Sequence, residues 1–119
     1  MLEISTSPST TTITVVSDLD ATMREQFPEM TARVSSLHRQ LLVLDLCRLD
    51  FLDSTGAAFI AAVTESTTRV GGVSLLRGAD KQARFVLHVC GILDAFRIDE
   101  HHSCETLEQV DDRTSAATG

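Results

Sequence analysis

Apolar and polar residues follow one another along the chain in a pattern typical of a small domain that contains both strands and helices. Short runs of β-branched and other apolar residues predict strands, and longer stretches with apolar residues at helical spacing predict helices. The predicted strands cover residues 2–4, 12–16, 41–46, 73–76 and 96–98. The predicted helices cover residues 55–70, 79–92 and 103–110. A further helix begins near Pro28, because proline suits only the first turn of a helix, and residues 21–27 before it are predicted to form a loop.

The order of these elements predicts the class of fold. Strands and helices alternate after residue 40, and parallel strands of this kind need crossover connections. The continuous apolar run LLVLDL (41–46) is typical of a central strand. With an N-terminal strand or hairpin added, the pattern predicts a single α/β domain with a small mixed sheet. We expect this domain to cover residues 1–110 and the polar residues 111–119 to be disordered.

Charge and hydropathy exclude several classes of partner. The chain has 119 residues, a net charge of −7 and a mean hydropathy of +0.08. An acidic protein repels phosphates, so neither a nucleic acid nor an anionic membrane surface is expected as a partner. No apolar run approaches the roughly 18 residues of a membrane span, and the first residues lack the pattern of a signal peptide. The expected location is therefore the cytoplasm.

The cysteines and histidines give little sign of a metal site or of cross-links. Cys47, Cys90 and Cys104 are odd in number and unrelated in spacing, which argues against a disulfide framework. Cys47 and Cys90 are each expected to be a small buried residue, while a regulatory disulfide stays open as an alternative. His101 and His102 lie close to Cys104, but no second cluster completes a tetrahedral metal site. We therefore expect a solvated loop there, with no metal and no other cofactor.

The stretch Asp53-Ser54-Thr55-Gly56 gathers polar groups between a predicted strand and a predicted helix. Asp20 ends an earlier strand, and functional sites of open α/β sheets gather at the edge where such strands end. A hydroxyl of Ser54 or Thr55 can cap the helix, and the positive end of the helix tolerates an added phosphate. The residues alone leave a simple cap and a functional site as alternatives.

This stretch does not indicate an enzyme. A serine nucleophile needs a base and oxyanion donors, but the chain has no G-x-S-x-G motif and no histidine near the stretch. An aspartic-protease site needs two carboxylates that share a proton, and its glycine follows two residues after the aspartate, not three. A P-loop would need a second glycine and a lysine. We therefore expect a protein without catalytic activity.

Several segments together resemble one known family. The segment LLVLDLCRLDFLDSTGAAFIAAV (41–63) resembles the core of the STAS domain, which occurs in bacterial anti-sigma factor antagonists. VVSDLD (15–20), VGGVSLL (70–76) and KQARFVLHVCGILDAFRI (81–98) resemble further parts of the family in the same order. The ordered set is more specific than the four-residue motif alone. The resemblance implies a STAS fold, in which helices pack mainly on one face of a small mixed β-sheet.

The resemblance also implies a partner switch. The unphosphorylated antagonist binds an anti-sigma factor, a kinase with a histidine-kinase-like ATPase fold, and thereby frees a sigma factor. The kinase phosphorylates the motif and binding is lost, and a PP2C-type phosphatase resets the antagonist. Carried over by position, Ser54 is the phosphoacceptor and Thr55 is the alternate. Asp20, Asp53 and Gly56 join these two residues in the implied partner-binding surface.

Three departures from the family pattern leave other functions open. Ser17 stands where the family usually has glycine, the segment from Asp20 to Pro28 is longer than usual, and Ala57-Ala58 replaces Leu-Gly. The alternative is an accessory STAS subunit of a lipid or anion transport system, which docks to an ATPase or a permease. A nucleotide-binding STAS module is a third interpretation.

Overall fold

Five strands form one mixed sheet in the order β1-β2-β3-β4-β5. The computed structural model describes residues 1–38, 40–99 and 104. β1 pairs with β2 in antiparallel orientation, and all other neighbouring strands are parallel, as the predicted crossovers require. The strands are β1 (Leu2–Thr6), β2 (Thr10–Leu19), β3 (Leu41–Leu52), β4 (Val73–Arg77) and β5 (Arg97–Ile98).

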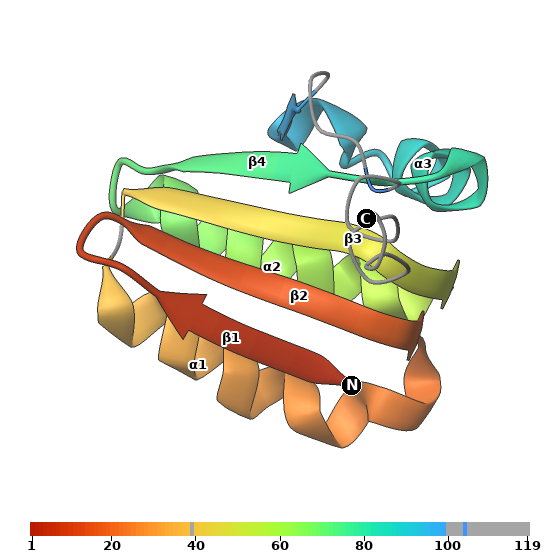
Figure 1. The fold of residues 1–119 in the computed structure, drawn as a ribbon, viewed down its shortest axis with the longest axis horizontal. Helices are drawn as coiled ribbons and strands as arrows, with labels where there is room; N and C mark the ends of the chain where they lie inside the picture. The colour runs from red at the N-terminus through yellow and green to blue at the C-terminus, as the bar shows by residue number, and fades with distance from the viewer. Residues whose placement is uncertain (39, 100–103, 105–119) are drawn as a thin grey trace, which may run out of the picture.

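Two long helices cover one face of this sheet. In Figure 1, α1 and α2 lie side by side behind the strands, and no helix of the described residues covers the opposite face of the sheet. The rings of Phe27 and Phe59 stack where the two helices meet, with their centroids 4.6 Å apart. The predicted fold class is therefore confirmed. The helices are α1 (Phe27–Leu37), α2 (Ser54–Arg69) and α3 (Lys81–Val89), with short 3₁₀ segments η1 (Ala21–Gln26) and η2 (Leu93–Ala95).

The hydrophobic core lies between the sheet and these helices. Side chains of β2 alternate between the core and the opposite face up to Val15, and Leu42, Leu44 and Leu46 of β3 face the core, as expected for strands covered on one side. α3 adds Ala83 and Leu87 to the same core. Burial of each large apolar side chain contributes about 1.5–3 kcal/mol to folding, so this layer supplies most of the driving force. Fully buried members include Ile13, Val15, Leu44, Ile60 and Val63.

The predicted start of α1 and both predicted ends of α2 lie within one residue of the structure, whereas α3 is shorter than the predicted 79–92. Pro28 lies in the first turn of α1, where its missing N–H has no partner to lose. The predicted loop before it is the 3₁₀ segment η1 together with Phe27, the first residue of α1. Asp80 caps α3 and accepts a hydrogen bond from the Ala83 N–H at 2.9 Å. None of the described helices is long and apolar enough to cross a membrane.

β3 is longer than the sequence predicts, because it continues past residue 46 to Leu52. Its register against β2 shifts twice, between Thr14 and Val16 and between Ser17 and Asp18. Such bulges insert unpaired residues and break the alternation of inward and outward side chains. In the sequence, the residues after 46 therefore resemble a loop. In the structure they continue β3, which ends at Leu52, directly before Asp53.

The expectation that the cysteines are unpaired and buried was wrong. Cys47 forms a disulfide with Cys104, 57 residues further along the chain, and Cys90 is a free, exposed thiol. Sequence spacing cannot reveal this pairing, because it depends on how the fold brings β3 and a later segment together. The predicted helix at 103–110, apart from Cys104, and the polar residues 111–119 lie outside the described residues, as do His101 and His102.

Ser17 provides a test of the local backbone. Its φ of 74° lies in the left-handed region, which costs an L-residue roughly 1–2 kcal/mol. Glycine avoids this cost but gains entropy in the unfolded chain, which offsets about 0.4–1 kcal/mol. We expect Ser17→Gly to raise the free energy of unfolding by about 0.5–1 kcal/mol, measured by urea denaturation. The control Ser17→Ala keeps the β-carbon and should give no gain. Equal stabilities of the two variants would contradict this account.

Candidate functional site

Asp53 ties the start of α2 to two neighbouring segments. Its Oδ1 caps the helix by accepting a hydrogen bond from the Gly56 N–H at 2.8 Å. Its Oδ2 accepts from the Ala21 N–H at 3.3 Å, and its own N–H donates to the Leu19 carbonyl at 3.3 Å. One side chain therefore joins the end of β3, the start of α2 and the segment after β2.

The suggestion that Ser54 or Thr55 caps the helix was wrong, since Asp53 is the cap. A capping residue needs extended backbone, and Asp53 has a φ of −114° and a ψ of −177°. Ser54 is already the first residue of α2. The hydroxyls of the motif are therefore not needed to begin the helix.

Gly56 permits the first turn of α2 to lie directly against the end of β2. A β-carbon at this position would collide with the carbonyl oxygen of Leu19 and would come within 2.9 Å of the Leu52 side chain. The backbone of β2 cannot move away easily, because it is held in the sheet. The glycine thus sets how closely α2 approaches the segment that contains Asp20.

Asp20 lies at the same edge of the sheet, as predicted, and has a similar structural role there. It caps η1 by accepting hydrogen bonds from the Thr22 N–H, at 3.0 Å, and from the Thr22 hydroxyl. The Ala21 N–H next to it is the group that bonds to Asp53. The two predicted aspartates therefore lie on adjacent segments that hydrogen bonds hold together.

The two hydroxyls of the motif differ in their surroundings. Ser54 is exposed, whereas Thr55 is half-buried. Thr55 lines a surface hollow of about 640 Å³ between α1 and α2, together with Phe27 and Pro28. Neither hydroxyl forms a hydrogen bond with another of the described residues. Ser54 is thus the more accessible of the two groups.

Backbone donors remain open beside the exposed hydroxyl. The first N–H groups of a helix have no partner within the helix, and Asp53 satisfies only that of Gly56. The N–H groups of Ser54 and Thr55 therefore stay available at the positive end of the helix dipole. This arrangement can accommodate a phosphoryl group on the side chain of Ser54.

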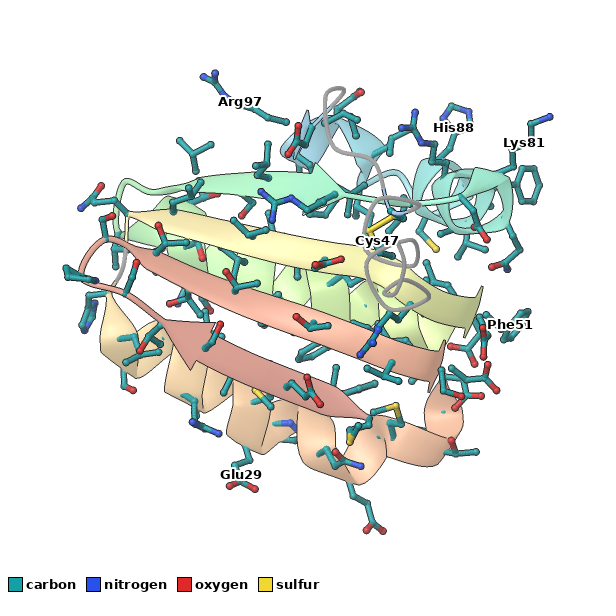
Figure 2. The ribbon with its side chains drawn as sticks, viewed as in Figure 1. Glu29, Cys47, Phe51, Lys81, His88 and Arg97 are labelled. Atoms are coloured by element: carbon teal, nitrogen blue, oxygen red, sulfur yellow. A yellow bond between two sulfur atoms is a disulfide. The ribbon has the colours of Figure 1, made fainter. Side chains whose placement is uncertain are left out.

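Three exposed residues at this edge were not singled out by the sequence analysis. Asp18 and Asp50 carry exposed carboxylates near the ends of β2 and β3. Phe51, which pairs in register with Asp18, is 45% exposed and points away from the end of β3 (Figure 2). The signal was present, because the aspartates of SDLD and LDFLD fall at the ends of two parallel strands. This signal was missed because the strand that is now β3 was predicted to end at residue 46, before Asp50 and Phe51.

A glutamine on α3 holds the last residue of β3 in place. The Gln82 side chain accepts from the Leu52 N–H at 3.1 Å and donates to the Leu52 carbonyl at 2.8 Å. It thereby satisfies both backbone groups at the strand end, as a further strand would. Nothing in the sequence around residue 82 predicts this contact, because it links positions 30 residues apart.

Four carboxylates lie on the segments that meet at this edge, and none of them forms an ion pair with another of the described residues. The ion pairs found among the described residues are Glu65–Arg69 and Arg77–Asp99, and neither involves this edge. The carboxylates belong to Asp18, Asp20, Asp50 and Asp53. The edge is therefore a negatively charged surface with one exposed aromatic ring.

Comparison with known families agrees with this geometry. The family profile described as the STAS domain matches residues 1–106, a range that includes all of the described residues. The chain belongs to the STAS domain family. A search of curated protein sequences finds no match.

Solved structures of other STAS proteins share the fold. An anti-sigma factor antagonist from Mycobacterium paratuberculosis has a TM-score of 0.72 at 20% identity, covering 94% of each chain. Unphosphorylated SpoIIAA, an anti-sigma factor antagonist, has a TM-score of 0.70 at 19% identity, covering 93% of this chain and 96% of that one. Phosphorylated SpoIIAA from Bacillus has a TM-score of 0.67 at 18% identity, covering 92% and 99%. At such low identities these likenesses establish the fold of this STAS domain.

Gly56→Ala tests the close approach of α2 to β2. Helix propensity alone would make alanine more stable by up to about 1 kcal/mol. The collision with Leu19 should reverse this sign and lower the free energy of unfolding by about 1–3 kcal/mol. Urea denaturation measures the difference. A variant more stable than the wild-type STAS domain would show that the contact is not tight.

Asp53→Ala tests the bridge between the segments. The variant loses the helix cap and the bond to Ala21, so we expect a loss of about 1–2 kcal/mol in unfolding free energy. Asp50→Ala is the matched control, because it removes the same charge from an exposed side chain with no hydrogen bond to the described residues. The control should stay within about 0.5 kcal/mol of wild type. Equal losses in the two variants would assign the effect to charge instead.

Proposed function

We propose that this STAS domain is an anti-sigma factor antagonist that phosphorylation of Ser54 switches off. The unphosphorylated form binds an anti-sigma factor kinase with a histidine-kinase-like ATPase fold and frees a sigma factor. The phosphorylated form does not bind, and a PP2C-type phosphatase restores the first state. The observation that carries the proposal is the exposed Ser54 hydroxyl on the first residue of α2, beside open backbone donors.

The exposure of the hydroxyls favours Ser54 over Thr55 as the phosphoacceptor. A kinase must place the acceptor oxygen in line with the γ-phosphate of its nucleotide, which requires free access. Ser54 offers this access, whereas Thr55 is half-buried in the hollow beside Phe27 and Pro28. The structural neighbours that are antagonists, one of them solved in a phosphorylated form, support phosphorylation as the regulatory step but do not bear on which hydroxyl accepts it.

Phosphorylation at this position should alter the surface and leave the fold intact. The cap, the close helix approach and the strand-end clamp belong to Asp53, Gly56 and Gln82, and none of them uses the Ser54 hydroxyl. The N-terminus of α2 favours an added anion by about 0.3–1 kcal/mol at an exposed position. The modification should therefore change the free energy of unfolding of the domain only slightly.

The same modification should strongly weaken an interface at this edge. A phosphoryl group adds about −1.5 to −2 charge beside the four carboxylates described above. A partner that packs against the serine hydroxyl has no volume for this group and must remove water from a dense cluster of negative charges. Loss of binding without unfolding is the expected result.

The proposed role implies a setting for the protein. A kinase that uses ATP and a sigma factor are cytoplasmic, so the antagonist is proposed to act in the cytoplasm, with residues 1–110 as its STAS domain. It is proposed to act by binding rather than by catalysis, and to contact neither nucleic acid nor a membrane. Asp20, Asp53, Ser54, Thr55 and Gly56 are its proposed partner-binding residues.

Affinity capture from the native host tests the proposal. We expect wild type and Ser54→Ala to retain a small histidine-kinase-like ATPase, and Ser54→Glu to lose at least nine-tenths of it, measured by quantitative mass spectrometry. Thr68→Glu is the matched control, because it adds the same charge at an exposed site near the other end of α2. Phosphopeptide mapping should place the phosphate on Ser54.

Other outcomes would replace the proposal. Equal capture of a transporter ATPase by all variants, with neither hydroxyl modified, would favour the accessory-subunit alternative. A rise in melting temperature with GTP would favour the nucleotide-binding module.

A further inference from the structure

Neither cysteine of the disulfide belongs to the hydrophobic core. Cys47 is half-buried on β3, and the half-buried Cys104 follows the last strand. The residues of the core, and those packed against it, all precede residue 99. The described core is therefore built without the two cysteines, and both of them are half-buried.

The disulfide packs against the turn that leads from β4 to α3. A β-carbon at Gly78 would lie 2.5 Å from the Cys47 sulfur and 2.6 Å from the Cys104 sulfur. Gly78 also has a φ of 78°, a conformation that side chains disfavour. Figure 2 shows the sulfur–sulfur bond beside β3, on the side where β4 leads to α3. The turn and the disulfide thus fit each other closely.

This turn connects the disulfide to the edge of the sheet that carries Ser54. Asp80 caps α3 immediately after the turn, and Gln82 holds both backbone groups of Leu52. Cys47 itself lies on β3, the strand that ends at Leu52. Two short paths therefore lead from the sulfur atoms to the same strand end. One follows the backbone of β3, and the other runs through the packing at Gly78 and the hydrogen bonds of Gln82.

We propose that Cys47 and Cys104 are a reversible redox modification site. In the oxidised form the disulfide ties Cys104 to β3 and braces the Gly78 turn. In the reduced form this link is lost and the turn loosens, while the domain stays folded. The proposal rests on the proposed function in one respect, because disulfides of cytoplasmic proteins are typically transient and redox-sensing.

The chemistry is a thiol–disulfide exchange with a dithiol reductant. A thiolate of the dithiol attacks one sulfur of the pair, the sulfur–sulfur bond breaks and a mixed disulfide forms. The second thiol of the reductant then displaces the protein sulfur. Cys47 and Cys104 together take up two electrons and two protons, and the dithiol becomes a disulfide. Oxidised dithiol of the same class drives the reverse reaction.

A redox titration of the full chain tests the site directly. The Cys90→Ser variant removes the exposed free thiol, so that only Cys47 and Cys104 can be alkylated. The protein is equilibrated in buffers with graded ratios of reduced to oxidised dithiothreitol, alkylated and weighed by mass spectrometry. We expect the two thiols to appear together in one reversible transition, while the far-UV circular dichroism spectrum stays the same.

Hydrogen exchange of the two forms tests the link to the strand end. Reduction should speed amide exchange several-fold in residues 77–82 and near Leu52, and leave α1 unchanged. Cys104→Ser in the same background should show the pattern of the reduced form even under oxidising conditions. This variant keeps the folded core, since Cys104 contributes nothing to it.

Three results would overturn the proposal. The first is a reduced protein that has lost its folded circular dichroism spectrum, which would make the disulfide a structural necessity. The second is a pair of thiols that stays open to alkylation in fully oxidised buffer. The third is identical hydrogen exchange in both forms. None of these measurements involves a partner or Ser54, so they fail or succeed independently of the proposed phosphorylation switch.

Discussion

The approach of α2 to the end of β2 depends on a single contact, that of Gly56 with the Leu19 carbonyl. With no β-carbon in the way, the first turn of the helix sits against the strand end, and Asp53 reaches the Ala21 N–H with one oxygen while capping α2 with the other. Two parallel strands therefore end at one small edge of the domain, and α2 begins at the same edge. The position of every proposed partner-binding residue follows from this junction.

The structure separates the groups that hold this edge together from the group that is proposed to switch it. Asp53, Gly56 and Gln82 satisfy backbone groups or permit close packing, so their loss should affect folding. Ser54 makes none of these contacts and projects from the first residue of the helix. A modification there changes the charge and volume of the surface while the junction beneath it persists. This division of roles allows a binding protein to be turned off without being unfolded.

The disulfide is proposed to act on this same edge from a position earlier on β3. Cys47 lies on β3 before the site, and the Gly78 turn leads to the α3 residue that clamps the strand end. A change of redox state at the surface is thereby proposed to reach the same edge that phosphorylation modifies. Two independent chemical signals would then act on one surface of one small domain.

The general fold was predictable because strands and helices of this chain keep their own hydrophobic periods. The edge was predictable in part, since Asp53 does bond to the residue that follows Asp20, where the parallel strands end. The length of β3 was not, because two bulges interrupt its alternation. The N-cap of α2 was assigned to Ser54 or Thr55 and not to Asp53. All three side chains are able to cap a helix, and the backbone geometry, which the sequence does not reveal, determines which of them does so. The Gln82 clamp and the disulfide join residues far apart in the sequence, and no local pattern carries that information.

The most direct test of the central claim is to place phosphoserine at position 54 during synthesis of the protein. Its affinity for the captured ATPase is then compared with that of the unmodified protein by titration calorimetry, and both forms are compared by amide NMR spectra. The account predicts at least a hundredfold loss of affinity, with spectral changes confined to the residues around Ser54. Unchanged affinity would show that the exposed serine is no switch. Spectral changes throughout the domain would show that the phosphate acts by disturbing the fold.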